Sequence, residues 1–82
     1  MNGRRRAKLK EARAKLLEVR TKLGQIRDEI DLIRDEEDDA RENMPENLQY
    51  SERYVASEDS SRAMENAASY INDAIVSIDE AI

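Results

Sequence analysis

Cysteine and histidine are both absent from this chain of 82 residues. Their absence excludes disulfide bonds, thiol nucleophiles, zinc sites built from these side chains, and the commonest general base of enzymes. Phenylalanine and tryptophan are absent as well, and glycine occurs only twice. Such a sequence, with 40% charged residues, is typical of long helices and not of a sheet.

The chain also lacks several signatures of membrane insertion and of catalysis. No apolar run approaches the ~20 residues of a membrane-spanning helix, and no apolar segment follows the basic start as in a signal peptide. We therefore expect a cytoplasmic protein. No Gly-rich phosphate loop is present, and no serine has an evident base, so we expect no enzyme and no cofactor. The acidic run 35–39 lacks the spacing of a calcium loop, so we expect a solvated helix face and no metal.

The net charge of −5 is unevenly distributed. Residues 1–27 have a net charge of +8, whereas residues 28–82 have a net charge of −13. A basic start can bind phosphates, but no aromatic residue lies within it to stack on bases. The possible phosphate contacts are Arg4, Arg5 and Arg6. We favour a different interpretation, in which this start lies beside the acidic end of the chain near Asp79 and Glu80.

A seven-residue repeat runs through the first half of the chain. Position a holds Leu9, Leu16, Leu23, Ile30, Glu37 and Met44. Position d holds Ala12, Val19, Ile26, Ile33 and Ala40. This repeat predicts a coiled-coil helix over about residues 5–43. Pro45 ends it, because the residue before a proline avoids helical angles.

The repeat resumes after a turn over about residues 44–50. Position a then holds Tyr54, Ser61, Ala68, Ile75 and Ile82, and position d holds Tyr50, Ser57, Met64, Ile71 and Ile78. Ser51 is a suitable N-cap for this second helix, over about residues 51–82. The sequence therefore predicts an all-α fold with one domain, 1–82: a long antiparallel two-helix hairpin that pivots near residue 47.

The flanking e positions of the first helix are all arginine. They are Arg6, Arg13, Arg20, Arg27, Arg34 and Arg41. The pivot at residue 47 predicts ion pairs across the flank of the hairpin. The expected pairs are Arg34 with Glu58, Arg27 with Glu65, and Arg13 with Asp79. Arg20 and Arg41 would face Asn72 and Ser51, which leaves both arginines without a carboxylate and available to a ligand.

A second line of small residues runs along the second helix. Its members are Ala56, Ser60, Ala63, Ala67, Tyr70, Ala74, Ser77 and Ala81. One line serves the hairpin, so the other needs a further partner. A hairpin of this size also buries little apolar surface by itself. We therefore expect a homo-oligomeric helical bundle, at least a dimer; the alternative is a monomer with an alanine-rich solvent face.

The turn collects the residues best suited to bind a small ligand. Guanidinium groups bind phosphate, and tyrosine rings stack on bases. The candidate ligand-binding residues are Arg41, Tyr50, Arg53, Tyr54 and Arg20. The alternative is that Tyr50 and Tyr54 fill the core of the hairpin beside Met44 and Ala40.

The segments NMPENLQYSERY and ASYINDAIVSIDEAI carry a family resemblance. They resemble small helical-hairpin proteins of phages and prophages in Gram-positive bacteria. The chain is also distantly similar to the hairpin of phage cyclic-nucleotide sponges, of the anti-CBASS and anti-Thoeris type. The matching positions are Pro45, Ser51, Met64, Ala67, Tyr70, Asn72, Ala74 and Ile75. The resemblance implies an anti-defence protein that sequesters a cyclic nucleotide or an ADP-ribose-derived signal, without catalysis, in the cytoplasm of an infected bacterial host.

Two other functions remain open. The charged outer helices are suited to a protein–protein inhibitor or to a structural coiled-coil scaffold. Binding of nucleic acid through the basic start is the third hypothesis.

Overall fold

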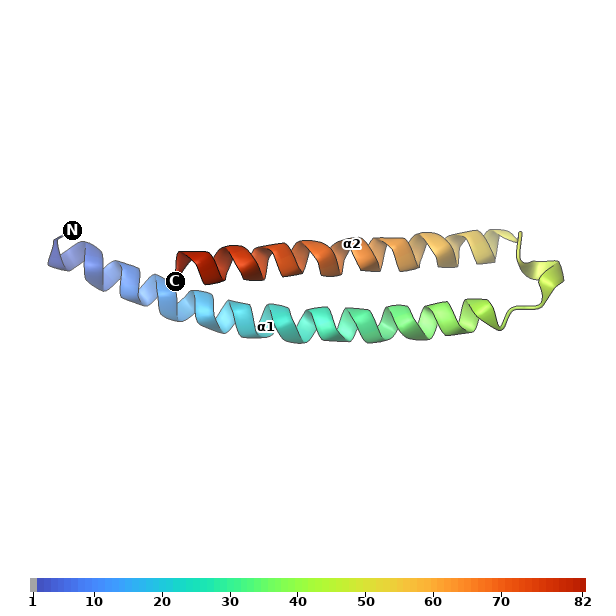
Figure 1. Ribbon diagram of the computed structural model, residues 1–82, viewed down its shortest axis with the longest axis horizontal. Coiled ribbons are helices and arrows are strands. Elements are labelled where there is room, and N and C mark those ends of the chain that lie inside the picture. Colours follow the sequence, from blue (N-terminus) through green and yellow to red (C-terminus); the bar gives the residue numbers. More distant parts are fainter. Residues whose placement is uncertain (1) are drawn as a thin grey trace.

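The computed structural model describes residues 2–82, which form an antiparallel helical hairpin (Figure 1). Helix α1 spans Gly3–Glu42, a short 3₁₀ turn η1 spans Glu46–Leu48, and helix α2 spans Glu52–Ala81. The molecule measures 68 × 15 × 15 Å, and its radius of gyration is 19.3 Å. A compact domain of this length has a radius of gyration of about 12 Å. The all-helical hairpin predicted from the heptads is confirmed, and its shape is a rod.

Both helices begin at a side-chain cap, and a single proline separates them. Asn2 accepts a hydrogen bond from the amide of Arg5 (2.9 Å), and Ser51 accepts one from the amide of Tyr54 (3.2 Å). These contacts satisfy amides that have no partner within the first helical turn. Pro45 follows the end of α1 with extended backbone angles, φ −57° and ψ 146°. The predicted helix end and the Ser51 cap therefore lie where the sequence places them.

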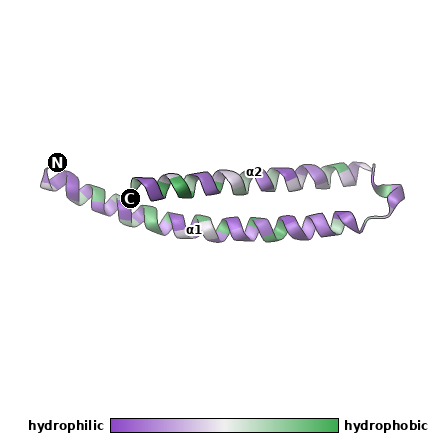
Figure 2. Ribbon diagram, in the orientation of Figure 1, coloured by the Kyte–Doolittle hydropathy of each residue, from purple (hydrophilic) through white to green (hydrophobic). Residues whose placement is uncertain are grey.

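Very little of the hairpin is buried. Among residues 2–82 the buried side chains are Ser57, Ser61, Ala68 and Ile75, all on α2. The turn half of the rod is mostly hydrophilic, and the strongest hydrophobic stretch lies in the C-terminal part of α2 (Figure 2). All four buried residues occupy a or d positions of the second helix, as the repeat predicts. Two of them, Ser57 and Ser61, are serines in the half of the hairpin nearer the turn, so the core there is partly polar.

Helix α1 turns a different face to α2 than the heptads predict. Residues at position a, such as Leu23 and Ile30, are half-buried. Val19, Ile26 and Ile33 at position d are instead 47%, 45% and 53% exposed. The e-position arginines take their place against α2, so α1 is rotated from the expected orientation. Arginine fits here because its aliphatic stem packs over small residues while its charged end reaches an acceptor at the edge.

The register also differs from the prediction, by one heptad. Arg20 pairs with Asp79 and not with Asn72, and Asn72 accepts a hydrogen bond from Arg27. The expected facing pairs of Arg27 with Glu65 and Arg13 with Asp79 are therefore wrong. The segment between the helices allows this shift. It contains η1 and extends past the end of α1, so α2 begins beyond that end and not directly opposite it (Figure 1).

Because of this register, α1 extends beyond the end of α2 (Figure 1). Arg13 donates a hydrogen bond to the carbonyl oxygen of Ile82 (2.7 Å), and every described residue from 2 to 15 is exposed. We call residues 3–12 the basic overhang. The expected position of the basic start beside Asp79 and Glu80 is therefore wrong.

Candidate functional site

The e-position arginines of α1 form a line that we call the arginine ladder, and four of them lie along the seam between the helices. The exposed fractions of the side chains of Arg20, Arg27, Arg34 and Arg41 are 41%, 30%, 24% and 17%, and decrease toward the turn. Arg20 binds both carboxylate oxygens of Asp79, with 2.9 Å between Nη2 and Oδ2. Arg27 donates from Nη1 to Oδ1 of Asn72 (2.7 Å). The ladder thus crosses from α1 to acceptors on α2.

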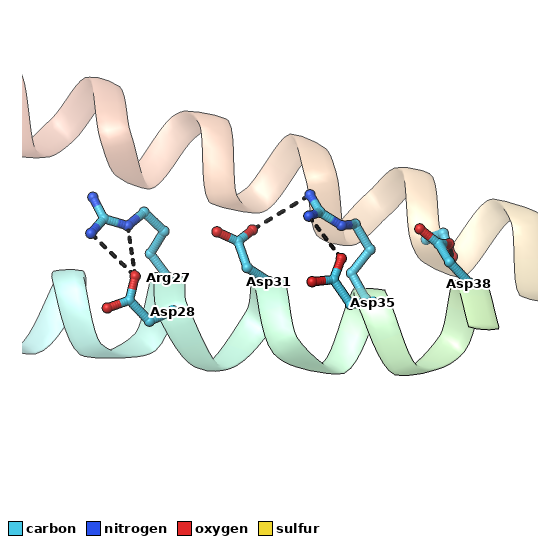
Figure 3. A network of polar contacts seen from close by, with 7 residues as sticks. Arg27, Asp28, Asp31, Asp35 and Asp38 are labelled. Atoms are coloured by element: carbon cyan, nitrogen blue, oxygen red, sulfur yellow. Dashed lines mark hydrogen bonds and ion pairs between the residues drawn. The ribbon is translucent and has the colours of Figure 1, made fainter. Parts of the chain in front are cut away.

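Carboxylates of α1 itself also pair with the ladder. Asp28, Asp31 and Asp35 all lie on α1, and Asp31 points toward α2 in Figure 3. Arg27 lies 3.2 Å from Asp28, while Arg34 lies 3.5 Å from Asp31 and 3.2 Å from Asp35. The predicted facing pair of Arg34 with Glu58 is replaced by these contacts within the helix. Carboxylates of α1 therefore neutralise part of the positive charge of the ladder, in addition to the acceptors on α2.

A polar cluster closes the seam next to the turn. Arg41 donates from Nη1 to Ser61 (2.8 Å) and Ser57 (3.2 Å), and from Nη2 to Asp38 (2.7 Å). The Ser61 hydroxyl donates to the same Asp38 oxygen (2.7 Å). Within the described chain, no buried side-chain nitrogen or oxygen lacks a hydrogen-bond partner. These four residues, which we call the Arg41 cluster, form a satisfied structural network.

This network and the Arg20–Asp79 pair shift the pKa values of their members. The hydrogen bond from Ser61, followed by that from Arg41, lowers the pKa of Asp38 below its usual range. The hydrogen bond from Arg20 lowers the pKa of Asp79 in the same direction. Each partner therefore stabilises the ionised form of the carboxylate that it contacts.

The expectation that Arg41 and Arg20 lack a carboxylate is wrong. Arg41 is bound to Asp38 and Arg20 to Asp79, so neither guanidinium is free for a ligand in this conformation. A shallow depression beside the cluster includes Asp38, Arg41, Glu58, Ser61, Arg62 and Glu65. Three of these six side chains are acidic, which opposes the binding of an anion. The heptad pattern could not reveal the Arg41 cluster, because the shifted register brings Ser57 and Ser61 to it.

The other candidate residues of the turn are more open. Tyr50 is 95% exposed, so it does not fill the core. Arg53 is exposed, and Tyr54 is half-buried at the start of α2. Tyr54 therefore fits the alternative of a core aromatic, whereas Tyr50 and Arg53 remain accessible.

An apolar face runs along one side of the hairpin. On α1 it contains Ala12, Val19, Ile26, Ile33 and Ala40, which we call the apolar line; all are exposed. The small-residue line of α2 is exposed too, except for the half-buried Ala67. In an antiparallel pair, helix geometry turns both lines to the same side of the seam, away from the Arg20–Asp79 contacts. The hairpin therefore has one polar side and one apolar side.

No protein-family model matches this chain, and no match was found among curated proteins or solved structures. Neither helix of the described chain is both long and apolar enough to cross a membrane. Within residues 2–82, no group of three or more acidic side chains is arranged to hold a metal ion.

Proposed function

We propose that this chain is a non-catalytic helical scaffold that assembles face to face with a second copy of itself. The exposure of the apolar line carries the proposal: Val19, Ile26 and Ile33 recur at seven-residue spacing and are 45–53% exposed. A seven-residue apolar repeat is the pattern by which helices pair. The hairpin buries only two apolar side chains among its described residues, Ala68 and Ile75, so further burial would stabilise it considerably.

The residues of the apolar line fit a second copy in the antiparallel direction. Pairing centred on Ile26 sets Ile26 against its own equivalent and Val19 against Ile33 of the second copy. It also sets Ala12 against Ala40. Each large residue then meets a large one and each alanine meets an alanine, as a two-fold axis requires of a self-complementary surface.

The charges beside the apolar line follow the same symmetry. The outer flanking positions hold Lys15 and Lys22 in the first half and Glu29 and Glu36 in the second half. Antiparallel pairing centred on Ile26 sets Lys22 against Glu29 of the second copy and Lys15 against Glu36. Opposite charges at such flanking positions select the partner and its orientation. Together they favour a second copy as the occupant of this face.

Sedimentation equilibrium and native mass spectrometry test this assembly. We expect the mass of two chains, each of 9.5 kDa. Ile26→Glu should weaken the dimer at least about a hundredfold, because burial of an unpaired carboxylate costs several kcal/mol. The matched control is Gln25→Glu, which makes the same charge change one residue away from the apolar line. A monomer at every concentration, or equal loss in both variants, contradicts the proposal.

Charge reversal tests the orientation. Lys22→Glu should weaken the dimer, and so should Glu29→Lys, because each places like charges opposite one another. The double variant should restore wild-type affinity, since the attractive pair re-forms with its signs exchanged. Failure of the double variant to recover rules out antiparallel pairing centred on Ile26.

A second candidate function is the binding of a small nucleotide signal at the turn. It is supported by Tyr50, which is 95% exposed, and by the neighbouring exposed Arg53. An open aromatic ring and a free guanidinium can hold a base and a phosphate. Calorimetric titration with cyclic oligonucleotides and ADP-ribose derivatives tests it, with Tyr50→Ala as the variant and Tyr70→Ala as the control. The absence of heat across that panel contradicts it.

A further inference from the structure

The basic overhang continues the seam of α1 without a second helix to cover it. Where α2 is present, the e-position arginines use the seam to reach oxygen acceptors: Arg20 reaches Asp79, and Arg27 reaches Asn72. Arg6 occupies the same heptad position, but α2 has ended before it (Figure 1). No acidic side chain of the described residues forms an ion pair with Arg6. At this end of α1, the face that contacts α2 further along the hairpin is exposed.

The uncovered seam forms a shallow basic groove. It is lined by Gly3, Arg6, Ala7, Leu9, Lys10 and Arg13. Arg6 and Lys10 are both exposed. Arg13 marks its inner end, where it donates to the carbonyl oxygen of Ile82. The groove thus presents cationic donors in a fixed helical arrangement.

The charge around the groove has a single dominant sign. The cations of the overhang are Arg4, Arg5, Arg6, Lys8 and Lys10, and Glu11 is its only acid. This segment is helical, and Asn2 caps its first turn. Its five cations are distributed over a rise of about 15 Å, which is roughly one cation per 3 Å. The phosphates of a single DNA strand follow one another at about 3.4 Å of helix axis, so the density of cations on the overhang is comparable to that of one strand.

We propose that the basic overhang binds the phosphate backbone of nucleic acid, without reading its sequence. Phosphate oxygens would take the place that Asp79 and Asn72 fill further along the ladder. The absence of aromatic residues from the overhang excludes base stacking as the source of affinity. The acidic remainder of the chain, with a net charge of −13 over residues 28–82, repels the polyanion and confines binding to this end.

Nucleic acid fits these observations better than a membrane does. A helix that lies on a bilayer needs a broad apolar face, commonly with aromatic residues. The overhang offers Leu9 as its one large apolar side chain, and cations surround it. The groove also lies on the seam side of α1, away from Ile26 and the apolar line, so dimer formation through that line leaves Arg6 and Lys10 open.

The test is fluorescence anisotropy of a short labelled DNA duplex titrated with the intact chain at several salt concentrations. Neutralised phosphates set the salt dependence of the affinity, with a slope of about −0.9 for each one. Five cations therefore predict a slope of up to about −4.5. Arg6→Ala with Lys10→Ala should weaken binding at least tenfold at low salt and reduce the steepness of the slope by about 1.8.

The matched control is Arg62→Glu, which makes the same change of two charge units at a side chain of α2 that is 68% exposed. It should bind as the wild type does. Equal weakening by the double variant and the control, or no binding by the wild type, overturns the proposal. Binding to anionic lipid vesicles with none to the duplex overturns it as well, and assigns the overhang to membranes. Circular dichroism should show both variants folded, since Arg6, Lys10 and Arg62 are all exposed.

Discussion

Arg20 on α1 binds both carboxylate oxygens of Asp79 on α2, and this pair fixes the hairpin one heptad away from the register that the pivot at residue 47 predicts. The apolar repeat fits both registers, because a shift of seven residues returns every position to an equivalent one. Polar contacts with specific partners therefore select between the two registers.

Charge exchange between these two residues should reveal the register in solution. Arg20→Asp and Asp79→Arg should each lower the melting temperature, because each sets like charges opposite one another. The double variant should recover most of the loss. Exposures of 41% and 46% screen the pair, so the effects should shrink in high salt. Thermal unfolding followed by circular dichroism measures all three variants, and a double variant less stable than both singles contradicts this register.

The Arg41 cluster should respond differently to partial and complete replacement. Arg41→Met alone should destabilise the hairpin, because Asp38 loses its cation and the buried Ser57 and Ser61 lose their donor. Adding Asp38→Leu, Ser57→Ala and Ser61→Ala should restore stability, since a polar network replaced as a whole leaves no unpaired group. Urea unfolding compares the two variants. Equal stability of the single and the quadruple variant would contradict this account.

Acid should weaken the hairpin through two carboxylates. The folded-state pKa values of Asp38 and Asp79 are lowered, so their stabilisation is fully present above the unfolded-state pKa of about 3.9. It is lost as the pH falls below that value and through the folded-state pKa values. The melting temperature should therefore be insensitive to these groups near neutral pH and decrease below about pH 4. Asp79→Asn should flatten this decrease, and an unchanged acid profile would show that Arg20 does not hold the carboxylate.

The apolar end of the seam should matter most for stability. Ile75 is 8% exposed, so Ile75→Ala should lower the free energy of unfolding by about 2 kcal/mol, the lower end of the range for buried isoleucine. The corresponding fall in melting temperature is about 10 °C for a chain of this size. Val76→Ala is the control, because Val76 is 55% exposed and should change the free energy by less than about 0.5 kcal/mol. Similar losses in both variants would contradict the assignment of Ile75 to the core.

Much of the fold could be predicted because it depends on local chemistry. The heptads define two helices, Pro45 ends the first, and the hydroxyl of Ser51 caps the second. The face of α2 that packs against α1 could be predicted in the same way, since Ala68 and Ile75 are apolar, occupy a positions and are buried. These features depend on spacing and on single residues, which a sequence states directly.

The face of α1 and the partners of its arginines could not be predicted in this way. Apolar content favours Ile26 over Arg27 in the seam, and the structure has the reverse. Arg27 is stabilised in the seam because Asn72 accepts its hydrogen bond and small residues of α2 leave room for its stem. These partners lie opposite Arg27 only in the observed register, which the heptads do not specify. The candidate site at Arg41 considered only partners on the second helix, whereas Asp38, three residues earlier on the same helix, pairs with Arg41.

The rod shape has a geometric consequence for anything that the two ends hold. The basic overhang lies at one end of a molecule 68 Å long, and Tyr50 lies at the turn at the other end. Paired helices resist bending, so the distance between these two ends would change little. Antiparallel pairing of two hairpins would place one overhang at each end of the assembly. Such an assembly could bridge two separate stretches of nucleic acid and keep them several nanometres apart.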